Sequence, residues 1–275
     1  MLRSMYSGVS GMRGFQTKLD VIGNNIANVN TVGFKAGRVM FKDILSQTVS
    51  GVTAPNDTTQ GGVNAQQIGL GSTIGSIDTV HTPGSAQTTN KPTDLRIDGD
   101  GFFMVKMSDE QEVPFLTRAG DFHVDGNRNL VTSDGMFVLS SEGEIITLGE
   151  EVTGFSISQN GAIITQGGDA DAADAIMIGV AKVVNPEGLE KIGGNLYRVT
   201  ANALDVDAGG EVVALQANSA EDGTGAIVAG QLEMSNVDLT GEFTEMIVAQ
   251  RGFQANSRII TTSDEVLQEV VNLKR

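Results

Sequence analysis

Several side chains of this 275-residue sequence are of types that can carry chemistry. Asp94, Asp98 and Asp100 could bind calcium, but their spacing departs from the EF-hand pattern and no glutamate closes it. His81 and His123 are 42 residues apart and belong to no HExxH motif, which argues against a zinc site. The chain contains no cysteine, so disulfides, thiolate catalysis and cysteine-based zinc sites are excluded.

Other patterns typical of enzymes are equally weak. The glycines of residues 69–75 resemble a dinucleotide-binding loop, but a preceding buried strand, a following helix and a P-loop lysine are missing. No G-x-S-x-G motif occurs. Carboxylate pairs for glycoside hydrolysis would need aromatic platforms, and the chain has no tryptophan. We predict no catalytic, cofactor-binding or metal-binding residue and no enzyme, with an acid hydrolase and a monomeric surface-binding module such as an adhesin left as alternatives.

Charge and glycine content divide the chain into three parts. Residues 1–45 carry a net charge of +4, residues 46–230 a net charge of −17, and residues 231–275 a net charge of −3; 27 of the 35 glycines lie in the middle part. The acidic middle part would repel phosphates, so no nucleic acid partner is expected. No run of 18 apolar residues occurs, so no membrane insertion is expected, and the first residues lack the apolar core of a secretory signal.

Both ends of the chain have the periodicity of amphipathic helices. Apolar residues recur at spacings of three and four from about residue 3 to residue 28, and again from residue 239 to residue 271. A capping-box pattern at residues 235–238 precedes the second helix, and a similar pattern at residues 262–265 leaves a break near Thr261 open.

The apolar arc of each helix is too broad to be covered by one partner helix, so we expect the two helices to pair and also to pack against other copies of the chain. The residues expected to form this self-assembly surface of inner helices are Leu2, Met5, Val9, Met12, Phe15, Leu19, Ile22, Ile26, Leu239, Phe243, Met246, Phe253, Ile260, Leu267 and Val271.

Short apolar stretches separated by turn dipeptides fill the middle of the chain, a pattern typical of hairpins. The predicted fold class is α+β, with paired, coiled-coil-like N- and C-terminal helices flanking an all-β, sandwich-like or barrel-like central domain. The predicted boundaries are a terminal helical domain at residues 1–45 and 231–275, a linker or extended segment at residues 46–70, and the central domain at residues 71–230. The turn dipeptides are Asp98-Gly99, Asp125-Gly126, Asp134-Gly135, Asn160-Gly161 and Gly167-Gly168.

Six segments resemble the signatures of one protein family, the bacterial flagellar rod and hook axial proteins. The N-terminal signature is matched by residues 7–12 and 20–35, the central β-domain motifs by 97–103 and 115–120, and the C-terminal signature by 235–240 and 246–257. The family-motif residues at the two ends are Asn24, Asn25, Asn28, Gly33, Phe34, Asn236, Gln250 and Arg251.

The resemblance implies a structural subunit without cofactors that polymerises helically into a hollow tube, with the terminal helices inside and the β domain outside. The segment from Gly23 to Ile26 resembles the hook version of the signature, which implies a compact hook subunit, a flexible joint that transmits motor torque; a distal-rod subunit, part of the drive shaft, is the alternative. The implied partners are copies of the chain, other axial proteins of the rod and the hook–filament junction, the hook cap and the type III export apparatus. The implied location is the extracellular hook or basal body, reached without a cleaved signal peptide.

Overall fold

The computed structural model describes residues 2–55, 61–108, 111, 113–149, 154–166, 176–204, 212–221 and 223–273. The chain forms two compact units, which are described separately below. Unit 1 comprises Met1–Ala27, Gly37–Thr79 and Asp238–Arg275, and unit 2 comprises Asn28–Ala36 and Val80–Val237. Neither helix of the described residues is both long and apolar enough to cross a membrane.

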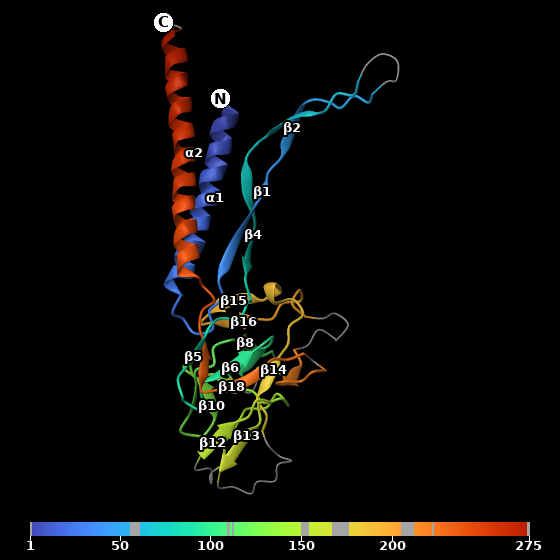
Figure 1. Cartoon of the computed structure of the whole chain (residues 1–275), viewed down its shortest axis with the longest axis vertical. Coiled ribbons are helices and arrows are strands. Elements are labelled where there is room, and N and C mark those ends of the chain that lie inside the picture. Colours follow the sequence, from blue (N-terminus) through green and yellow to red (C-terminus); the bar gives the residue numbers. More distant parts are fainter. Residues whose placement is uncertain are drawn as a thin grey trace. The chain divides into compact units, whose positions relative to one another are not determined.

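Unit 1 contains the two helices that the sequence predicts, α1 (Leu2–Ala27) and α2 (Leu239–Leu273). They pack side by side and run antiparallel (Figure 1). Lys18 Nζ lies 2.6 Å from Glu245 Oε2, and nearer the start of α1 a Cβ added to Gly8 would lie 3.5 Å from Ile260 Cγ1. Because Gly8 has no side chain, the backbones of α1 and α2 can approach each other closely at this point.

The start and the continuity of α2 differ from the capping patterns in the sequence. Asp238 caps the helix, since its carboxylate accepts a hydrogen bond from the Thr240 N–H at 3.0 Å, whereas the Ser235 hydroxyl accepts one from Val237. The helix continues through Thr261 without a break. Thr262 bonds through its hydroxyl to the Arg258 carbonyl one turn earlier, at 2.9 Å, so its side chain does not cap a new helix.

A long hairpin completes unit 1. β1 (Gly37–Asp43) pairs antiparallel with β4 (Ser72–Thr79), and β2 (Ser46–Ser50) pairs with β3 (Gln66–Gly69) further along the same arm. The arm packs on α1, where the rings of Phe15 and Phe41 lie 5.9 Å apart. Residues 46–50 and 66–69 belong to the stretch predicted as a linker or extended segment, and they form paired strands.

Unit 2 is built on a nine-stranded, open sheet and not on a closed barrel. The strand order is β15-β16-β8-β7-β11-β10-β9, and β14 pairs with both β7 and β17. The bounds of these strands are β7 (Phe102–Lys106), β8 (Phe115–Thr117), β9 (Phe122–Val124), β10 (Leu130–Thr132), β11 (Phe137–Val138), β14 (Gly179–Ala181), β15 (Glu190–Gly193), β16 (Leu196–Arg198) and β17 (Ala214–Gln216).

Three strand pairs and one short helix accompany this sheet. The pairs are β5 (Ala86–Thr88) with β19 (Gln231–Glu233), β6 (Leu95–Asp98) with β18 (Ala226–Ala229), and β12 (Gly154–Ile157) with β13 (Ile163–Gln166); the 3₁₀ helix η1 spans Pro186–Gly188. Strands from the last part of unit 2, β18 and β19, therefore pair with strands from its first part.

The core of unit 2 lies on both faces of β7, where alternate residues point to opposite sides. Phe103 belongs to a larger cluster and meets Phe122 edge to face, with ring centroids 5.1 Å apart. Phe102 belongs to a smaller cluster and lies 5.8 Å from the Tyr197 ring. Because both faces are covered, β7 is apolar at every position from 102 to 105.

Three of the predicted hairpin turns are confirmed, each joining two strands that are consecutive in the sequence. The turn dipeptides at residues 125–126, 134–135 and 160–161 join β9 to β10, β10 to β11, and β12 to β13. Asp98-Gly99 does not make a hairpin, because β6 pairs with β18 and not with β7. The Gly167-Gly168 turn lies outside the described residues.

The division of the chain also differs from the sequence-based boundaries. Residues 28–36 and 231–237, assigned to the helical ends, belong to unit 2, and residues 71–79, assigned to the central domain, belong to unit 1. The reason is strand pairing: β4 pairs with β1, and β19 pairs with β5.

Candidate assembly surface

The first helix is covered on two sides within one chain. α2 packs against one side of α1, and the hairpin arm packs against another, where a Cβ added to Gly14 would lie 2.8 Å from the Phe41 ring. Ile22 is 3% exposed, and the other predicted assembly residues of α1 with a described side chain are half-buried. The breadth of the apolar arc on α1 is thus explained largely by contacts within the chain.

The second helix has a large uncovered apolar surface. Leu239, Phe243 and Ile247 follow one another at four-residue spacing, and Phe243 and Ile247 are 50% and 53% exposed. A second series of exposed apolar side chains, whose successive members are 11, 7 and 4 residues apart, lies on another side of the helix. This second series consists of Val248, Ile259, Val266 and Val270.

The predicted assembly residues thus fall into two groups. Those that face into unit 1 or are half-buried in it are Met5, Val9, Met12, Phe15, Leu19, Ile22, Ile26, Met246, Ile260 and Leu267, and those that are exposed are Leu239, Phe243, Phe253 and Val271. The side chain of Leu2 lies outside the described residues. The sequence analysis missed the exposed Ile247, Val248, Ile259, Val266 and Val270, although their spacing was available as a signal.

The family-motif residues divide in the same way. Gln250 and Arg251 are exposed on α2, and Asn24 is exposed on α1. Asn25 is 1% exposed in unit 1: its amide donates to the Gly37 carbonyl at 2.8 Å and to Glu242 Oε1 at 2.9 Å, and its carbonyl accepts from the Gly37 N–H. Asn25 thereby joins α1 to the start of β1 and to the first turn of α2, which is an internal role.

The remaining motif residues lie within unit 2. Asn28 accepts a hydrogen bond from the Thr31 hydroxyl in the turn after α1, and Phe34 is covered by the Lys191 ammonium, 5.0 Å from the ring centroid. Gly33 has φ of +70°, and a Cβ there would lie 2.6 Å from the Ala119 backbone nitrogen, so only glycine fits.

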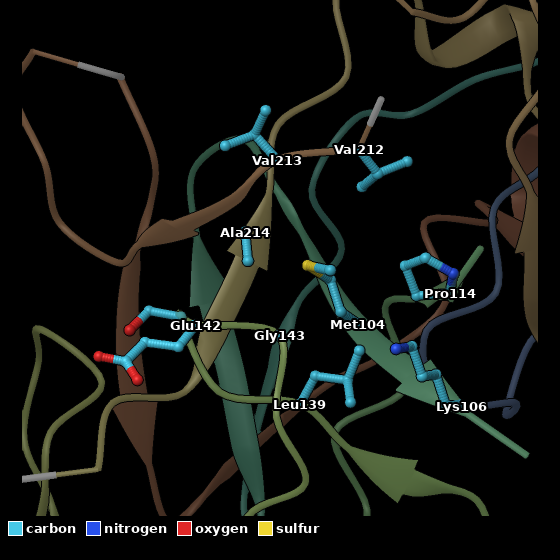
Figure 2. A pocket seen from close by; sticks show the side chains of 10 residues that line it. Met104, Lys106, Pro114, Leu139, Glu142, Gly143, Val212, Val213 and Ala214 are labelled. Atoms are coloured by element: carbon cyan, nitrogen blue, oxygen red, sulfur yellow. The ribbon is translucent and has the colours of Figure 1, made fainter. Parts of the chain in front are cut away.

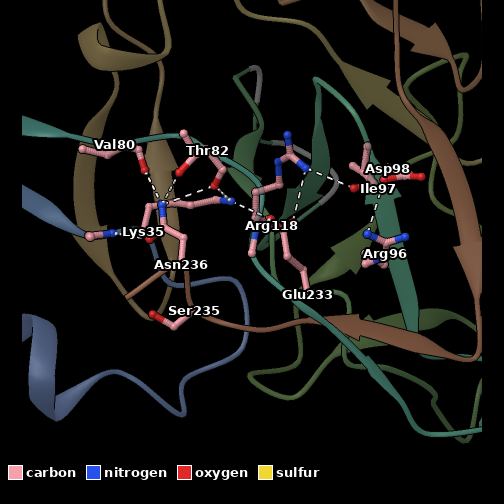
Figure 3. A network of polar contacts seen from close by, with 12 residues as sticks. Lys35, Val80, Thr82, Arg96, Ile97, Asp98, Arg118, Glu233, Ser235 and Asn236 are labelled. Carbon is pink, nitrogen blue, oxygen red and sulfur yellow. Dashed lines mark hydrogen bonds and ion pairs between the residues drawn. The ribbon is translucent and has the colours of Figure 1, made fainter. Parts of the chain in front are cut away.

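Asn236 binds two segments of unit 2 at once. Its side-chain carbonyl accepts from the Ala36 N–H at 2.8 Å, and its amide donates to the Val80 carbonyl at 2.8 Å (Figure 3). The motif at residues 235–240 therefore fixes the ends of the 28–36 and 80–237 segments to each other.

A buried ionic network, which the sequence analysis did not single out, lies beside Asn236 (Figure 3). Lys35 Nζ lies 2.6 Å from Glu233 Oε1, and Arg118 lies 3.2 Å from Glu233 Oε2. All three side chains are at most 5% exposed. Arg118 also donates to the carbonyls of Ile97 and Gly99, at 3.3 and 2.7 Å. One carboxylate therefore compensates two buried cations from distant parts of the sequence.

The charges of this network shift the titration of its members. Burial alone would raise the pKa of Glu233, but Arg118, Lys35 and the hydrogen bonds from Lys35 and the Gly84 N–H hold it below its ordinary value. Burial lowers the pKa of Lys35, against the opposing effect of Glu233. Glu233 is thus held as a carboxylate, the form that the two cations require.

His81 lies close to this cluster of cations. Burial, followed by the charges of Lys35, Lys191 and Arg118, lowers the pKa of His81 to about 4. Its ring lies against the rings of Phe102 and Tyr197, 5.7 and 5.6 Å between centroids. His81 is therefore neutral near pH 7 and acts as part of the apolar packing of unit 2.

A pocket of about 320 Å³ lies in unit 2 between β7, the turn at residues 141–143 and the start of β17 (Figure 2). Its wall combines the apolar Met104, Leu139 and Val212 with the charged Lys106 and Glu142. Among the described residues, no group of three or more His, Cys, Asp or Glu side chains is arranged to hold a metal ion.

We predict that Glu233→Gln destabilises unit 2 by about 3–5 kcal/mol, because it leaves two buried cations without a counter-charge. Glu190→Gln, which removes an exposed partner of Arg198, is the matched control and should cost less than about 1 kcal/mol. Unfolding can be followed by Tyr197 fluorescence in a Tyr6→Phe background, since the chain has two tyrosines and no tryptophan. Equal losses in the two variants would contradict the role given to the network.

We predict that His81 makes unit 2 sensitive to acid. Between pH 6.5 and about 4 the unfolded chain binds a proton at His81 that the folded chain does not, so stability falls as the pH falls through this range. In His81→Phe the fall in unfolding midpoint over this range should be smaller than in the unsubstituted chain, whatever the change at pH 7. His123→Gln, which removes an exposed histidine, is the matched control; a slope for His81→Phe equal to that of this control would refute the prediction.

Comparison with known proteins matches three regions of the chain to flagellar family models. The description "Flagella basal body rod protein" applies to residues 5–35, "Flagellar hook protein FlgE/F/G D1 domain" to residues 96–165, and "Flagellar basal body rod FlgEFG protein C-terminal" to residues 228–273. These regions cover most of α1, five strands of the nine-stranded sheet of unit 2 (β7 to β11), and the whole of α2.

Similar proteins are found over the full length. The flagellar basal-body rod protein FlgG of Bacillus subtilis is 53% identical over 275 residues, covering 100% of both chains. The FlgG protein of Borreliella burgdorferi is 36% identical over 278 residues, and its flagellar hook protein FlgE is 30% identical over 453 residues, each alignment covering 100% of both chains. With the signatures at both ends and in the middle matched, the chain belongs to the flagellar rod and hook axial protein family.

Proposed function

We propose that this chain is the distal-rod subunit of the flagellar basal body, a structural protein that polymerises helically as part of the drive shaft. The observation that carries the proposal is the end-to-end identity of 53% with a basal-body rod protein of matching length. The similarity to a hook protein is lower, 30%, and its alignment extends over 453 residues. The comparisons thus favour the rod over the hook, which the sequence analysis preferred from the four residues Gly23–Ile26.

The uncovered face of α2 supports a polymer. Burying one Leu, Ile or Phe side chain contributes about 1.5–3 kcal/mol, and the chain leaves Phe243, Ile247 and several further apolar side chains of α2 exposed. Contacts between unlike surfaces of neighbouring copies that do not close into a ring produce an open filament. We infer that α2 supplies most of the inner contacts and that α1, covered by α2 and the hairpin arm, supports it.

The proposal includes the neighbours of such a subunit. Copies of the chain are its main partner, other axial proteins adjoin the two ends of the polymer, and the type III export apparatus delivers it to the basal body. These partners come from the family resemblance, and the hook cap, which belonged to the hook interpretation, is not part of the proposal.

Deleting the gene in the source bacterium and imaging isolated basal bodies by electron microscopy tests the assignment. The rod should end early, and hook and filament should be missing; reintroducing the gene should restore a straight rod. Basal bodies that keep a complete rod and lack only the hook would contradict the proposal and support a hook subunit.

Phe243→Asp and Ile247→Asp should prevent polymerisation while leaving the monomer folded, because both side chains are exposed in the single chain. Ile164→Asp is the matched control, since Ile164 is 54% exposed in unit 2 and outside the helices. Sedimentation and electron microscopy of the purified full chain measure assembly, and circular dichroism checks the fold. Normal polymers from either α2 variant, or equal loss in the control, would refute the proposed inner surface.

A further inference from the structure

Four charged side chains form a line along the exposed side of α2. Arg251, Arg258, Glu265 and Glu269 are separated by 7, 7 and 4 residues, spacings that place them on one face of a helix. All four are exposed. We call this line the charge stripe; its first half is positive and its second half is negative.

The charge stripe is not neutralised within the described part of the chain. None of the ion pairs between described residues includes any of its four members. Arg258 and Glu265 are seven residues apart, beyond the three- or four-residue spacing at which side chains meet on one helix. The two halves therefore stay separated by about 10–20 Å along the helix, at 1.5 Å per residue.

A partner of the charge stripe must itself carry both signs in sequence. A polyanion would match Arg251 and Arg258 and would be repelled by Glu265 and Glu269, and a basic surface would meet the opposite difficulty. A second copy of α2 offers the required pattern. Ile247 lies one turn before Arg251 on the same face and is 53% exposed, so it adds apolar contact at that end.

We propose that the charge stripe sets the axial stagger between neighbouring copies in the polymer, with the arginines of one α2 facing the glutamates of a parallel α2 that is shifted along its axis. This inference rests on the proposed function, since it assigns the partner of the same surface. Parallel helices in register would place like charges opposite each other, and so would a shift of seven residues, which brings Arg251 to Arg258. A shift of about 11–14 residues, about 17–21 Å, brings Arg258 to Glu269 and Arg251 to Glu265.

The parallel, staggered arrangement also explains why assembly continues. In an antiparallel pair each stripe would satisfy the other completely, which closes a two-fold dimer. In a staggered parallel pair the arginines of one copy and the glutamates of the other remain free. The staggered pair therefore stays open to further contacts, unlike the antiparallel dimer.

Charge reversal in the purified full chain tests the stripe. Arg251→Glu with Arg258→Glu, and separately Glu265→Lys with Glu269→Lys, give stripes of a single sign and should raise the concentration needed for polymerisation at least about tenfold. The variant with all four reversals restores complementarity with the signs exchanged and should polymerise within about threefold of the unsubstituted chain. Raising the salt from about 0.05 M to about 0.5 M should weaken assembly of the unsubstituted chain and strengthen that of the single-sign variants.

Asp264→Lys is the control for a single reversal, because it makes the same change of charge as Glu265→Lys at the adjacent position, which lies on a different face of α2. It should polymerise like the unsubstituted chain. If the chain polymerises and the two single-sign variants polymerise equally well, the charge stripe is not an interface and the proposed function stands. If four reversals do not rescue assembly, or if the unsubstituted chain forms only closed dimers, the staggered contact is overturned. If the unsubstituted chain forms no polymer and does not restore the rod in a deletion strain, the proposed function fails instead.

Discussion

The buried ion pairs of Glu233 with Lys35 and Arg118 are the interaction on which the folding of unit 2 depends. The carboxylate faces both basic residues, and all three side chains are buried away from water. A buried cation without a counter-charge costs several kcal/mol, so neither basic residue is tolerated there unless the segment that carries Glu233 is in place. Because this segment is β19, from the far end of unit 2, the network makes the first, middle and last parts of the unit mutually dependent.

The family motifs are divided between internal structure and exposed surface. Asn25, Gly33, Phe34 and Asn236 satisfy backbone groups or fill tight contacts inside one unit. Gln250 and Arg251 face outward on α2. Motif residues can thus serve either of two roles. A buried motif residue stabilises the subunit itself, and an exposed one is available for contacts with another subunit. Of the two helices, α2 exposes most of the large apolar side chains, which is why the proposed assembly surface lies on α2.

The short-range features of this fold could be predicted from the sequence. Helix periodicity is a local signal, so both helices were found within one or two residues at their starts. The turns at residues 125–126, 134–135 and 160–161 also form from neighbouring residues. The pairing of β1 with β4 could not be predicted from local signals, because 28 residues separate the two strands.

The sequence by itself determined the two amphipathic helices, the β-rich middle and, through its ordered motifs, the family. Only the tertiary structure decided that the hairpin arm covers α1, that α2 stays open, and that Lys35, Arg118 and Glu233 meet although up to 198 residues separate them. The physical reason is the distance along the chain over which each effect acts. Periodicity and turn chemistry act over a few residues, whereas burial and charge compensation depend on which distant segments the fold brings together.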